Sequence, residues 1–420
     1  MGPEGDIAVK IKEKLMDQLE YKDDVSDETL KEIIGDEIRE YNLESHIPIK
    51  ERMELGRQIF HSMRKLDILQ DLIEDPSITE IMINGPDNVF AERNGRLSRL
   101  NVRFESEESL RSVIGQIVSK CNRVVNDSVP IVDARLTDGS RVNVVLNPVA
   151  INGPILTIRR FPKKPYLMDD LIRIGSLSKE AAQMLKDLVT AGYNIIISGG
   201  TGSGKTTFLN ALSAYIPSDE RIITIEDSAE LQIQGIDNLV RMETKNGNSE
   251  GSMPITIRDL IKASLRMRPD RIIVGEVRGG EAMDMVCSAM NCGHDGSMST
   301  VHSNSAADTI ARLETMILMA VELPVHAIRR QICSGVDIIV HLSRMRDKSR
   351  KVVEIVELLS TETGEVTVNP IYVFKEDLNG NKRDLSKVEG SLIRTGSLKD
   401  DKKLKNAGIY IDHGKEGVGA

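Results

Sequence analysis

The amino-acid sequence predicts an α/β protein in which a smaller α+β domain precedes a larger, helix-covered parallel sheet. Three observations support this fold class. Strands and helices alternate from about residue 177 to about residue 345, which is typical of a mostly parallel sheet with helices on its faces. A glycine-rich loop at residues 199–206 lies between an apolar strand and an apolar-periodic helix. Upstream, short strands and tight turns alternate with helices over about 110 residues, as in α+β domains.

The composition is that of a globular protein with more than one domain. The chain has 420 residues, of which 40% are hydrophobic and 28% charged, so it can bury a sizeable core. A net charge of −9, an aromatic content of 3% and the absence of Trp argue against a nucleic-acid-binding protein, which needs basic surfaces and aromatic platforms. Four cysteines in a chain of this length indicate reduced thiols in a cytoplasm and no disulfide framework.

The N-terminal sequence shows no secretion signal or membrane anchor. The stretch MGPEGDIAVKIKEKLMDQLE is charged and lacks the apolar core of a signal peptide. Elsewhere no apolar run approaches the ~20 residues that span a bilayer. We therefore expect a cytoplasmic protein without a membrane span of its own, in which any contact with a membrane goes through partner proteins.

Two segments make up the N-terminal part. Residues 1–45 are expected to form a helical appendage, because apolar residues recur there at helical spacing among many acidic ones. A docking arm for a partner protein is the alternative interpretation of this segment. Residues 46–160 are expected to form the α+β domain, in which an Asn-Gly pair predicts a hairpin turn and Ser106 begins a helix.

Three further segments complete the chain. Residues 161–176 contain two prolines and two lysines with little periodicity, and they are expected to form a linker that acts as a hinge. Residues 177–375 are expected to form the large α/β domain. Residues 376–420 are polar and charged, which predicts a mobile tail.

The clearest functional motif is the stretch GGTGSGKTT. It matches the phosphate-binding pattern G-x-x-x-x-G-K-[ST] and lies between a strand and a helix, as that pattern requires. Its glycines allow backbone N–H groups to wrap phosphates, and the following helix directs its positive end at the same anion. Lys205 is expected to contact the β- and γ-phosphates of a nucleotide, and Thr206 to ligate Mg²⁺. The predicted nucleotide-binding residues are Gly199, Gly200, Thr201, Gly202, Ser203, Gly204, Lys205, Thr206 and Thr207.

Acidic residues follow two later strands of the same domain. Glu226, with Asp227 and Glu230 behind it, ends the run RIITIE, and Glu276 follows the run RIIVG. Because ligands bind beyond the carboxyl ends of parallel strands, both groups are expected near the phosphate loop. Carboxylates in that position hold Mg²⁺ and orient water for hydrolysis.

Four motifs together resemble one family of ATPases. The stretches GGTGSGKTT, TIEDSAELQ, RMRPDRIIVGEVRGGEAMDM and GHDGSMSTVHSNS are similar, in order and spacing, to those of the ATPases of type II secretion, type IV pili and related machines. The resemblance covers about residues 50–360. The sequence around GEVRGGEAMDM and RLETMILMA is most similar to that of the CpaF/TadA branch, which powers tight-adherence (Flp-type) pili.

This resemblance implies a homohexameric ring of RecA-like P-loop ATPase domains, each joined by a flexible linker to an N-terminal α/β domain. It also implies that ATP binds between subunits. Among the residues here, it implies that Glu226 is the general base and that Glu276 acts on Mg²⁺ through water. His302, together with His294, corresponds to the histidine box, in which His302 contacts the γ-phosphate.

Two arginines of the N-terminal domain are further candidates. Arg135 and Arg141, in DARLTDGSRVN, resemble the arginines that this domain supplies to the nucleotide in the family. A guanidinium fork suits the negative charge that phosphoryl transfer spreads over oxygens. Arg159 and Arg160 are weaker candidates.

The expected function is a motor ATPase that powers assembly of tight-adherence pili, with integral inner-membrane platform proteins as its partners. A conjugation-type, type II secretion or archaellum ATPase is the alternative within the same family. A nucleic-acid translocase and a nucleotide-binding regulator without turnover are further alternatives. The acidic net charge argues against the translocase, and Glu226 with Glu276 against the regulator.

The loop CGHDGSMSTVHSNSAAD, residues 292–308, also allows a zinc site built from Cys287, Cys292, His294 and His302. Their spacing matches no common zinc motif, and positions i and i+5 of a helix diverge by ~140° around its axis. We therefore expect Cys287 to be a buried helix residue. The stretch STVHS is expected to be a strand that ends in His302 beside the phosphates.

Overall fold

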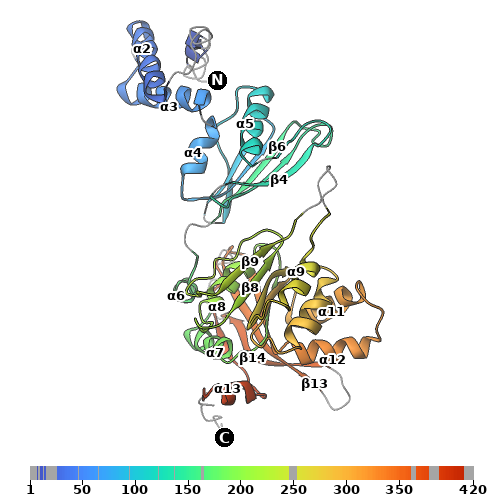
Figure 1. Ribbon diagram of the computed structural model, residues 1–420. Coiled ribbons are helices and arrows are strands. Elements are labelled where there is room, and N and C mark those ends of the chain that lie inside the picture. Colours follow the sequence, from blue (N-terminus) through green and yellow to red (C-terminus); the bar gives the residue numbers. More distant parts are fainter. Residues whose placement is uncertain are drawn as a thin grey trace. The chain divides into compact units, whose positions relative to one another are not determined.

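The computed structural model describes residues 7, 10–12, 14–15, 26–45, 47–64, 66–93, 95–121, 123–136, 138–161, 165–245, 253–360, 366–377 and 387–410. The chain divides into two compact units, Met1–Lys163 and Lys164–Ala420, whose elements are labelled in Figure 1. The division falls inside the segment that the sequence predicts to be a linker. In the part of the chain described, no helix combines the length and the apolar composition that crossing a bilayer requires.

The first unit contains an antiparallel sheet of six strands in the order β3-β2-β1-β6-β5-β4. The strands are β1 (Ile78–Asn84), β2 (Val89–Arg93), β3 (Arg96–Arg99), β4 (Ile131–Arg135), β5 (Arg141–Val145) and β6 (Ile155–Arg159). Helix α5 (Glu107–Lys120) begins at Ser106, whose hydroxyl accepts a hydrogen bond from the Ser109 N–H, as predicted. Buried residues of α5 share one core with alternate residues of the strands, which places the helix on one face of the sheet.

The helical part of the first unit is longer than the sequence predicts. Helices α2 (Asp27–Ser45), α3 (Ile49–Arg64) and α4 (Ile68–Glu74) precede the sheet. Apolar residues of α2 and α3 form a cluster of their own, separate from the sheet core; its buried members are Ile11, Leu15, Leu30, Ile34, Ile38, Leu55, Ile59 and Phe60. The appendage therefore includes α3, whose amphipathic face packs on α2, whereas the sequence boundary at residue 45 assigns α3 to the α+β domain.

The second unit contains a sheet of nine strands in the order β15-β14-β13-β12-β7-β11-β10-β8-β9. From β12 to β9 neighbouring strands are parallel, as predicted, and from β12 to β15 they are antiparallel. The strands are β7 (Ile195–Gly199), β8 (Ile222–Glu226), β9 (Leu239–Glu243), β10 (Arg271–Val277), β11 (Met298–Val301), β12 (Ile338–Arg344), β13 (Arg350–Ser360), β14 (Val366–Glu376) and β15 (Gly390–Arg394).

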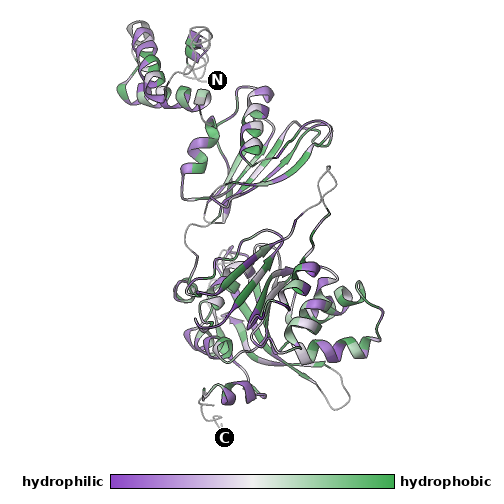
Figure 2. Ribbon diagram, in the orientation of Figure 1, coloured by the Kyte–Doolittle hydropathy of each residue, from purple (hydrophilic) through white to green (hydrophobic). Residues whose placement is uncertain are grey.

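Helices cover both faces of this sheet. They are α6 (Met168–Arg173), α7 (Lys179–Thr190), α8 (Lys205–Ser213), α9 (Ile257–Ser264), α10 (Glu281–Met283), the π-helix η1 (Asp284–Met290), α11 (Ala306–Leu318), α12 (Val325–Gly335) and α13 (Lys402–Asn406). Successive residues of β7 alternate between two cores: Ile195 and Ile197 pack with α7 and α8, and Ile196 packs with η1, α11 and α12. Figure 2 shows the result: the strands are mainly hydrophobic, whereas the helices carry both hydrophobic and hydrophilic residues.

Two segments differ from the sequence prediction. Helix α6 lies within the expected linker 161–176, because Met168 and Leu171 are buried in the core of the second unit. Residues 387–410, part of the expected mobile tail, are folded: β15 pairs with β14, and the Tyr193 hydroxyl donates to the carbonyl oxygen of Asp400 at 2.7 Å. Only a few apolar residues of this segment are buried, among many charges, which is why its composition resembles that of a tail.

Candidate nucleotide site

The phosphate loop joins the carboxyl end of β7 to the first turn of α8, as predicted. Gly204 has φ 95°, in the left-handed region that side-chain-bearing residues rarely adopt. A Cβ atom at Gly199 would overlap the backbone carbonyl oxygen of Leu342 on the neighbouring strand β12. Both positions therefore require glycine, because of the loop conformation at Gly204 and the close strand approach at Gly199.

Lys205 places its ammonium group at the centre of this loop. The residue is 7% exposed, and its Nζ donates to the carbonyl oxygens of Gly199 at 3.0 Å and Gly200 at 3.2 Å. It opens α8, whose N-terminal end carries partial positive charge, and Thr206 and Thr207 follow in the same turn. A fixed cation, a helix N-terminus and two hydroxyls form a binding site for an anion such as phosphate.

His302 connects the phosphate loop to Glu276. It follows β11 directly, as predicted, and its Nδ1 and Nε2 lie 3.2 and 3.3 Å from Lys205 Nζ. Its Nε2 also lies 2.9 Å from Glu276 Oε1, and Arg278 donates to Glu276 Oε2 at 2.9 Å. Burial and the Lys205 charge lower the pKa of His302 below its usual 6.5, so the ring is neutral at pH 7 and offers one donor and one acceptor.

Glu226 is the most deeply buried acidic residue at this edge of the sheet. It ends β8 with 3% of its surface exposed, and its Oε2 accepts the N–H groups of Glu230 at 2.7 Å and Leu231 at 2.9 Å. Within the described residues Oε1 has no hydrogen-bond partner. Burial raises the pKa of Glu226, although the two backbone donors act in the opposite direction. A carboxylate that is held at one oxygen and unsatisfied at the other is suited to orient a water molecule and accept its proton.

Arg350 is a residue of the site that the sequence analysis missed. It opens β13, and its Nε donates to the carbonyl oxygen of Gly202 in the phosphate loop at 2.9 Å. Its own carbonyl oxygen accepts the Ser176 hydroxyl at 2.8 Å, and Lys351 donates to Gly175 at 3.0 Å. The same short segment therefore holds the phosphate loop and the end of the predicted linker. No motif announces this role, since 148 positions separate Arg350 from Gly202.

His294 does not lie with His302. It precedes β11, whereas His302 follows it, so the two residues stand at opposite edges of the parallel sheet. The chain around His294 is held at the amino end of β7, where Asn194 Oδ1 accepts the N–H groups of Gly296 and Ser297. The prediction that His294 joins the phosphate site is wrong within one chain, because a strand separates the two histidines.

The four residues of the possible zinc site are likewise divided. Cys287 lies in η1 and is half-buried rather than fully buried, and burial raises the pKa of its thiol to about 11. The Cys292 thiol donates to the carbonyl oxygen of Cys287 at 3.3 Å. Among the described residues, no group of three or more His, Cys, Asp and Glu side chains is placed to hold a metal ion.

Arg135 and Arg141 lie in the first unit as cross-strand partners on β4 and β5. Arg135 Nε donates to the carbonyl oxygen of Gly139 at 3.2 Å, and the guanidinium lies 6.0 Å from the centre of the Phe161 ring. Arg159 ends β6, and Arg160 is the next residue. Arg160 donates to the carbonyl oxygen of Ile78 at 3.2 Å. Arg160, like Arg135, thus contacts a backbone carbonyl oxygen inside its own unit.

Comparisons with known proteins find one matching family and several similar proteins. Residues 62–378 match the sequence model of the family described as Type II/IV secretion system protein. A putative conjugal transfer protein of Mycobacterium tuberculosis is 35% identical over 301 residues, which cover 70% of this chain and 85% of that protein. The type IV secretion system protein VirB11 of Brucella suis is 34% identical over 307 residues, covering 66% and 84% of the two chains.

One solved structure supports the fold. The pilus retraction motor PilT, crystallised with bound ADP, superposes with a TM-score of 0.50 at 20% identity, covering 81% of this chain and 86% of that one. At this identity the likeness concerns the architecture alone.

Proposed function

Because the chain belongs to the type II/IV secretion system protein family, whose members hydrolyse ATP, we propose that it is the motor ATPase of a type IV secretion machine of the conjugal transfer kind. Its fold is that of the family, and the family hydrolyses ATP. The finer assignment is supported by the relatives named as a putative conjugal transfer protein, as TrbB and as VirB11.

The proposed machine differs from the one that the sequence motifs favour. The sequence around GEVRGGEAMDM favours an ATPase of tight-adherence pili. The named relatives instead support the conjugation-type machine that the sequence analysis keeps as an alternative. The tight-adherence pilus motor is therefore the second candidate, and it shares every residue of the nucleotide site with the first.

The observation that carries the proposal is the convergence of Lys205, His302, Glu276 and Glu226 at one edge of the sheet. The phosphate loop and Lys205 would bind the phosphates of ATP. Thr206 and Glu276 would hold Mg²⁺ together with phosphate oxygens, since Mg²⁺ takes few protein ligands and keeps water. When bound, the ion supplies charge neutralisation for phosphoryl transfer.

The remaining steps belong to the chain's own side chains. Glu226 would orient the attacking water through Oε1 and accept its proton, which its raised pKa favours. The neutral His302 would donate its one ring N–H to the terminal phosphate in place of Glu276, while Lys205 donates to the other ring nitrogen. Loss of that phosphate would then change the contacts of His302 with both partners.

Members of the family form hexameric motors within secretion systems. We extend this to the present chain as a homohexamer on the cytoplasmic side of the inner membrane, bound there by integral membrane proteins. Arg135 and Arg141 are proposed to reach the nucleotide from the first unit. Their guanidinium groups suit the charge that phosphoryl transfer develops.

Gene deletion in the source organism tests the choice of machine. The strain is complemented with the wild-type gene or with Lys205→Ala, and transfer of a marked plasmid or secreted protein is counted beside surface pili. Loss of transfer that only the wild-type gene restores supports the proposal. Loss of pili with transfer intact would select the pilus motor, and unchanged transfer and pili would overturn both.

A further inference from the structure

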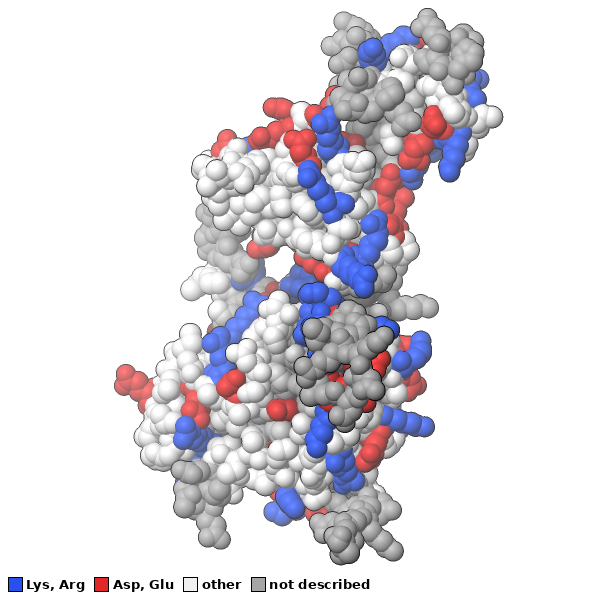
Figure 3. Space-filling view, turned by 180° about the vertical axis from the view of Figure 1, so that it is seen from behind, with Lys and Arg blue, Asp and Glu red and all other residues white. Residues whose placement is uncertain are grey.

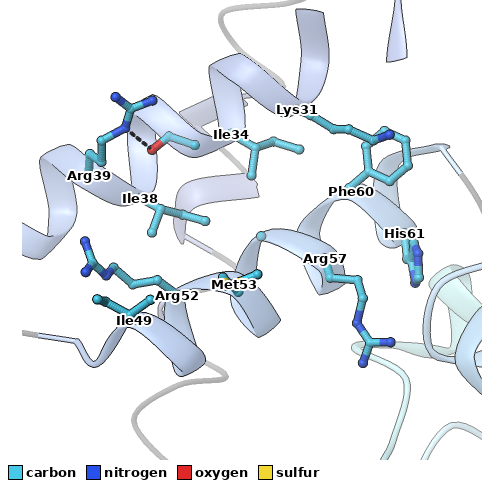
Figure 4. Close-up of a pocket in the computed structure, with 12 residues that line it drawn as sticks. Lys31, Ile34, Ile38, Arg39, Ile49, Arg52, Met53, Arg57, Phe60 and His61 are labelled. Atoms are coloured by element: carbon cyan, nitrogen blue, oxygen red, sulfur yellow. Dashed lines mark hydrogen bonds between the residues drawn. The ribbon is translucent and has the colours of Figure 1, made fainter. Parts of the chain in front are cut away.

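A groove of about 700 Å³ lies between α2 and α3, in the helical part of the first unit. Figure 4 shows its floor and rim. Its apolar lining consists of Ile34 and Ile38 from α2 with Ile49, Met53 and Phe60 from α3. Gly35 and Gly56 also line the groove.

Two apolar side chains of this groove are exposed to an unusual degree. Ile49 is 69% exposed and Met53 is 74% exposed, and the two lie one helical turn apart on α3. A contiguous apolar surface in a recess is the kind of patch that folded proteins reserve for binding. The groove is therefore a candidate interface.

The charged residues of the rim all carry the same sign. Lys31, Arg39, Arg52 and Arg57 line the groove together with His61, and among the described residues no carboxylate lines it. This is notable in a chain whose net charge is −9. The face of the molecule seen in Figure 3, by contrast, shows basic and acidic side chains interspersed within each unit.

The chain's own carboxylates use only some of these cations. Arg39 pairs with Asp36 at 2.8 Å, and Arg57 pairs with Glu54 at 2.7 Å and with Asp71 of α4 at 3.0 Å. Arg52 makes no ion pair with a described carboxylate, and its Nε is buried without a hydrogen-bond partner among the described residues. Arg52 itself is only partly buried and lines the groove, so its guanidinium charge can be paired by a carboxylate that a ligand brings, and a charge-assisted hydrogen bond of this kind is stronger than a neutral one.

We propose that the groove between α2 and α3 binds an acidic amphipathic helix of a partner protein. The apolar face of that helix would cover Ile49 and Met53, and its flanking carboxylates would pair with Arg52 and Lys31. Helix-in-groove recognition uses such a combination of an apolar ridge and complementary charges. The inference concerns this surface alone and uses no part of the nucleotide chemistry.

Two other occupants fit less well. A second copy of the chain packed groove to groove about a two-fold axis would bring equal basic rims together, which is repulsive. A flat anionic membrane surface would reach the exposed Met53 but would not fill the groove between the two helices. A helix alone matches both the depth and the charge of the groove.

The test uses the full-length protein and a synthetic probe. The probe is a fluorescein-labelled helical peptide of about 18 residues with leucines along one face and glutamates on its flanks, measured by fluorescence anisotropy. We expect saturable binding that weakens at least 10-fold in Met53→Glu and in Arg52→Glu. The matched control is Met253→Glu, because Met253 is a methionine of the second unit that is 84% exposed, and this variant should bind like the wild type. Circular dichroism and ATP turnover, both unchanged, would show that the variants fold.

Several results would overturn the inference. They are absence of binding up to 1 mM peptide, equal binding of a shuffled peptide or one with lysine for glutamate, and equal binding by Met53→Glu. Sedimentation with phosphatidylglycerol vesicles that depends on Met53, without peptide binding, would assign the groove to a membrane. Self-association that Met53→Glu abolishes would assign it to a second copy. None of these results bears on the ATPase site, so failure here is distinct from failure of the proposed function.

Discussion

The ammonium nitrogen of Lys205 lies 3.2 Å from Nδ1 of His302, although 97 positions separate the two residues. Adjacent parallel strands produce this contact, since β7 delivers the phosphate loop and β11 delivers the histidine at the same edge. Glu276, on the next strand β10, lies 2.9 Å from the other nitrogen of the ring. One imidazole thus touches both the residue proposed to bind phosphate and the carboxylate proposed to act on the metal ion.

The two histidines of the loop should separate in function. We expect His302→Ala to reduce ATP turnover about 100-fold, as removal of a hydrogen-bond donor to a reacting oxyanion does. Nucleotide affinity should change less than about threefold, because the phosphate loop and Lys205 remain. His294→Ala, at the opposite sheet edge, should leave turnover within about twofold. Steady-state kinetics and binding of a fluorescent nucleotide measure both, and equal losses in the two variants would contradict the placement.

The buried Glu226 carboxylate should lower the free energy of unfolding increasingly as the pH rises above 4.5. Its folded-state pKa is raised above 4.5, so the folded chain binds more protons than the unfolded chain as the pH rises from 4.5 towards that pKa. The wild type therefore loses stability over this window, whereas Glu226→Gln does not. We expect Glu226→Gln to melt at a higher temperature than the wild type at pH 8, with the difference shrinking as the pH falls to 4.5. Scanning calorimetry at several pH values measures this, and a constant difference would show that burial of the charge is not the cause.

Arg350 should position the phosphate loop without taking part in the chemistry. Loss of a hydrogen bond from a charged donor costs about 1.5 kcal/mol, which corresponds to about a 10-fold rise in KM for ATP in Arg350→Ala. Turnover at saturating ATP should change little. The control is Arg346→Ala in the same hairpin turn, because Arg346 pairs with Glu376 and not with the loop. A fall in kcat at unchanged KM would instead place Arg350 in the reaction itself.

Alanine substitutions at two glycines of the segment 292–308 allow a matched comparison of stability. Gly293 and Gly296 have φ values of 90° and 84°, so alanine is strained at either position. A Cβ at Gly296 would also overlap the buried guanidinium of Arg271, which is ion-paired with Glu220, whereas nothing lies within 4 Å at Gly293. We expect Gly296→Ala to lose about 3 kcal/mol of unfolding free energy and Gly293→Ala about 1 kcal/mol. Urea unfolding measures the two, and similar losses would refute the contact with Arg271.

Residues whose role is local were predictable from the sequence. The phosphate loop, the helix start at Ser106 and the strand that ends at His302 follow from short patterns whose physical cause lies within a few residues. The order of parallel strands then brings Glu226, Glu276 and His302 together without further information. The core of the candidate site is therefore readable from sequence.

The missed features depend on contacts that local patterns do not encode. Arg350 acts through pairing of β12 with β13, and the folded segment 387–410 through addition of β15 to the sheet edge. His294 was misplaced because two histidines eight positions apart look close in sequence, although a strand between them carries the chain across the sheet. The sequence analysis assigned helix α3 to the α+β domain instead of the helical appendage, because an amphipathic pattern does not indicate which neighbour covers the apolar face.

The most direct test of the central claim compares nucleotide binding with hydrolysis in the assembled full-length protein. We predict Mg²⁺-dependent phosphate release by the wild type, and nucleotide binding by Glu226→Gln within about threefold of wild type with turnover at least about 100-fold slower. Equal rates of phosphate release by Glu226→Gln and the wild type would contradict the assignment of Glu226 as the general base and, with it, the proposed use of this site.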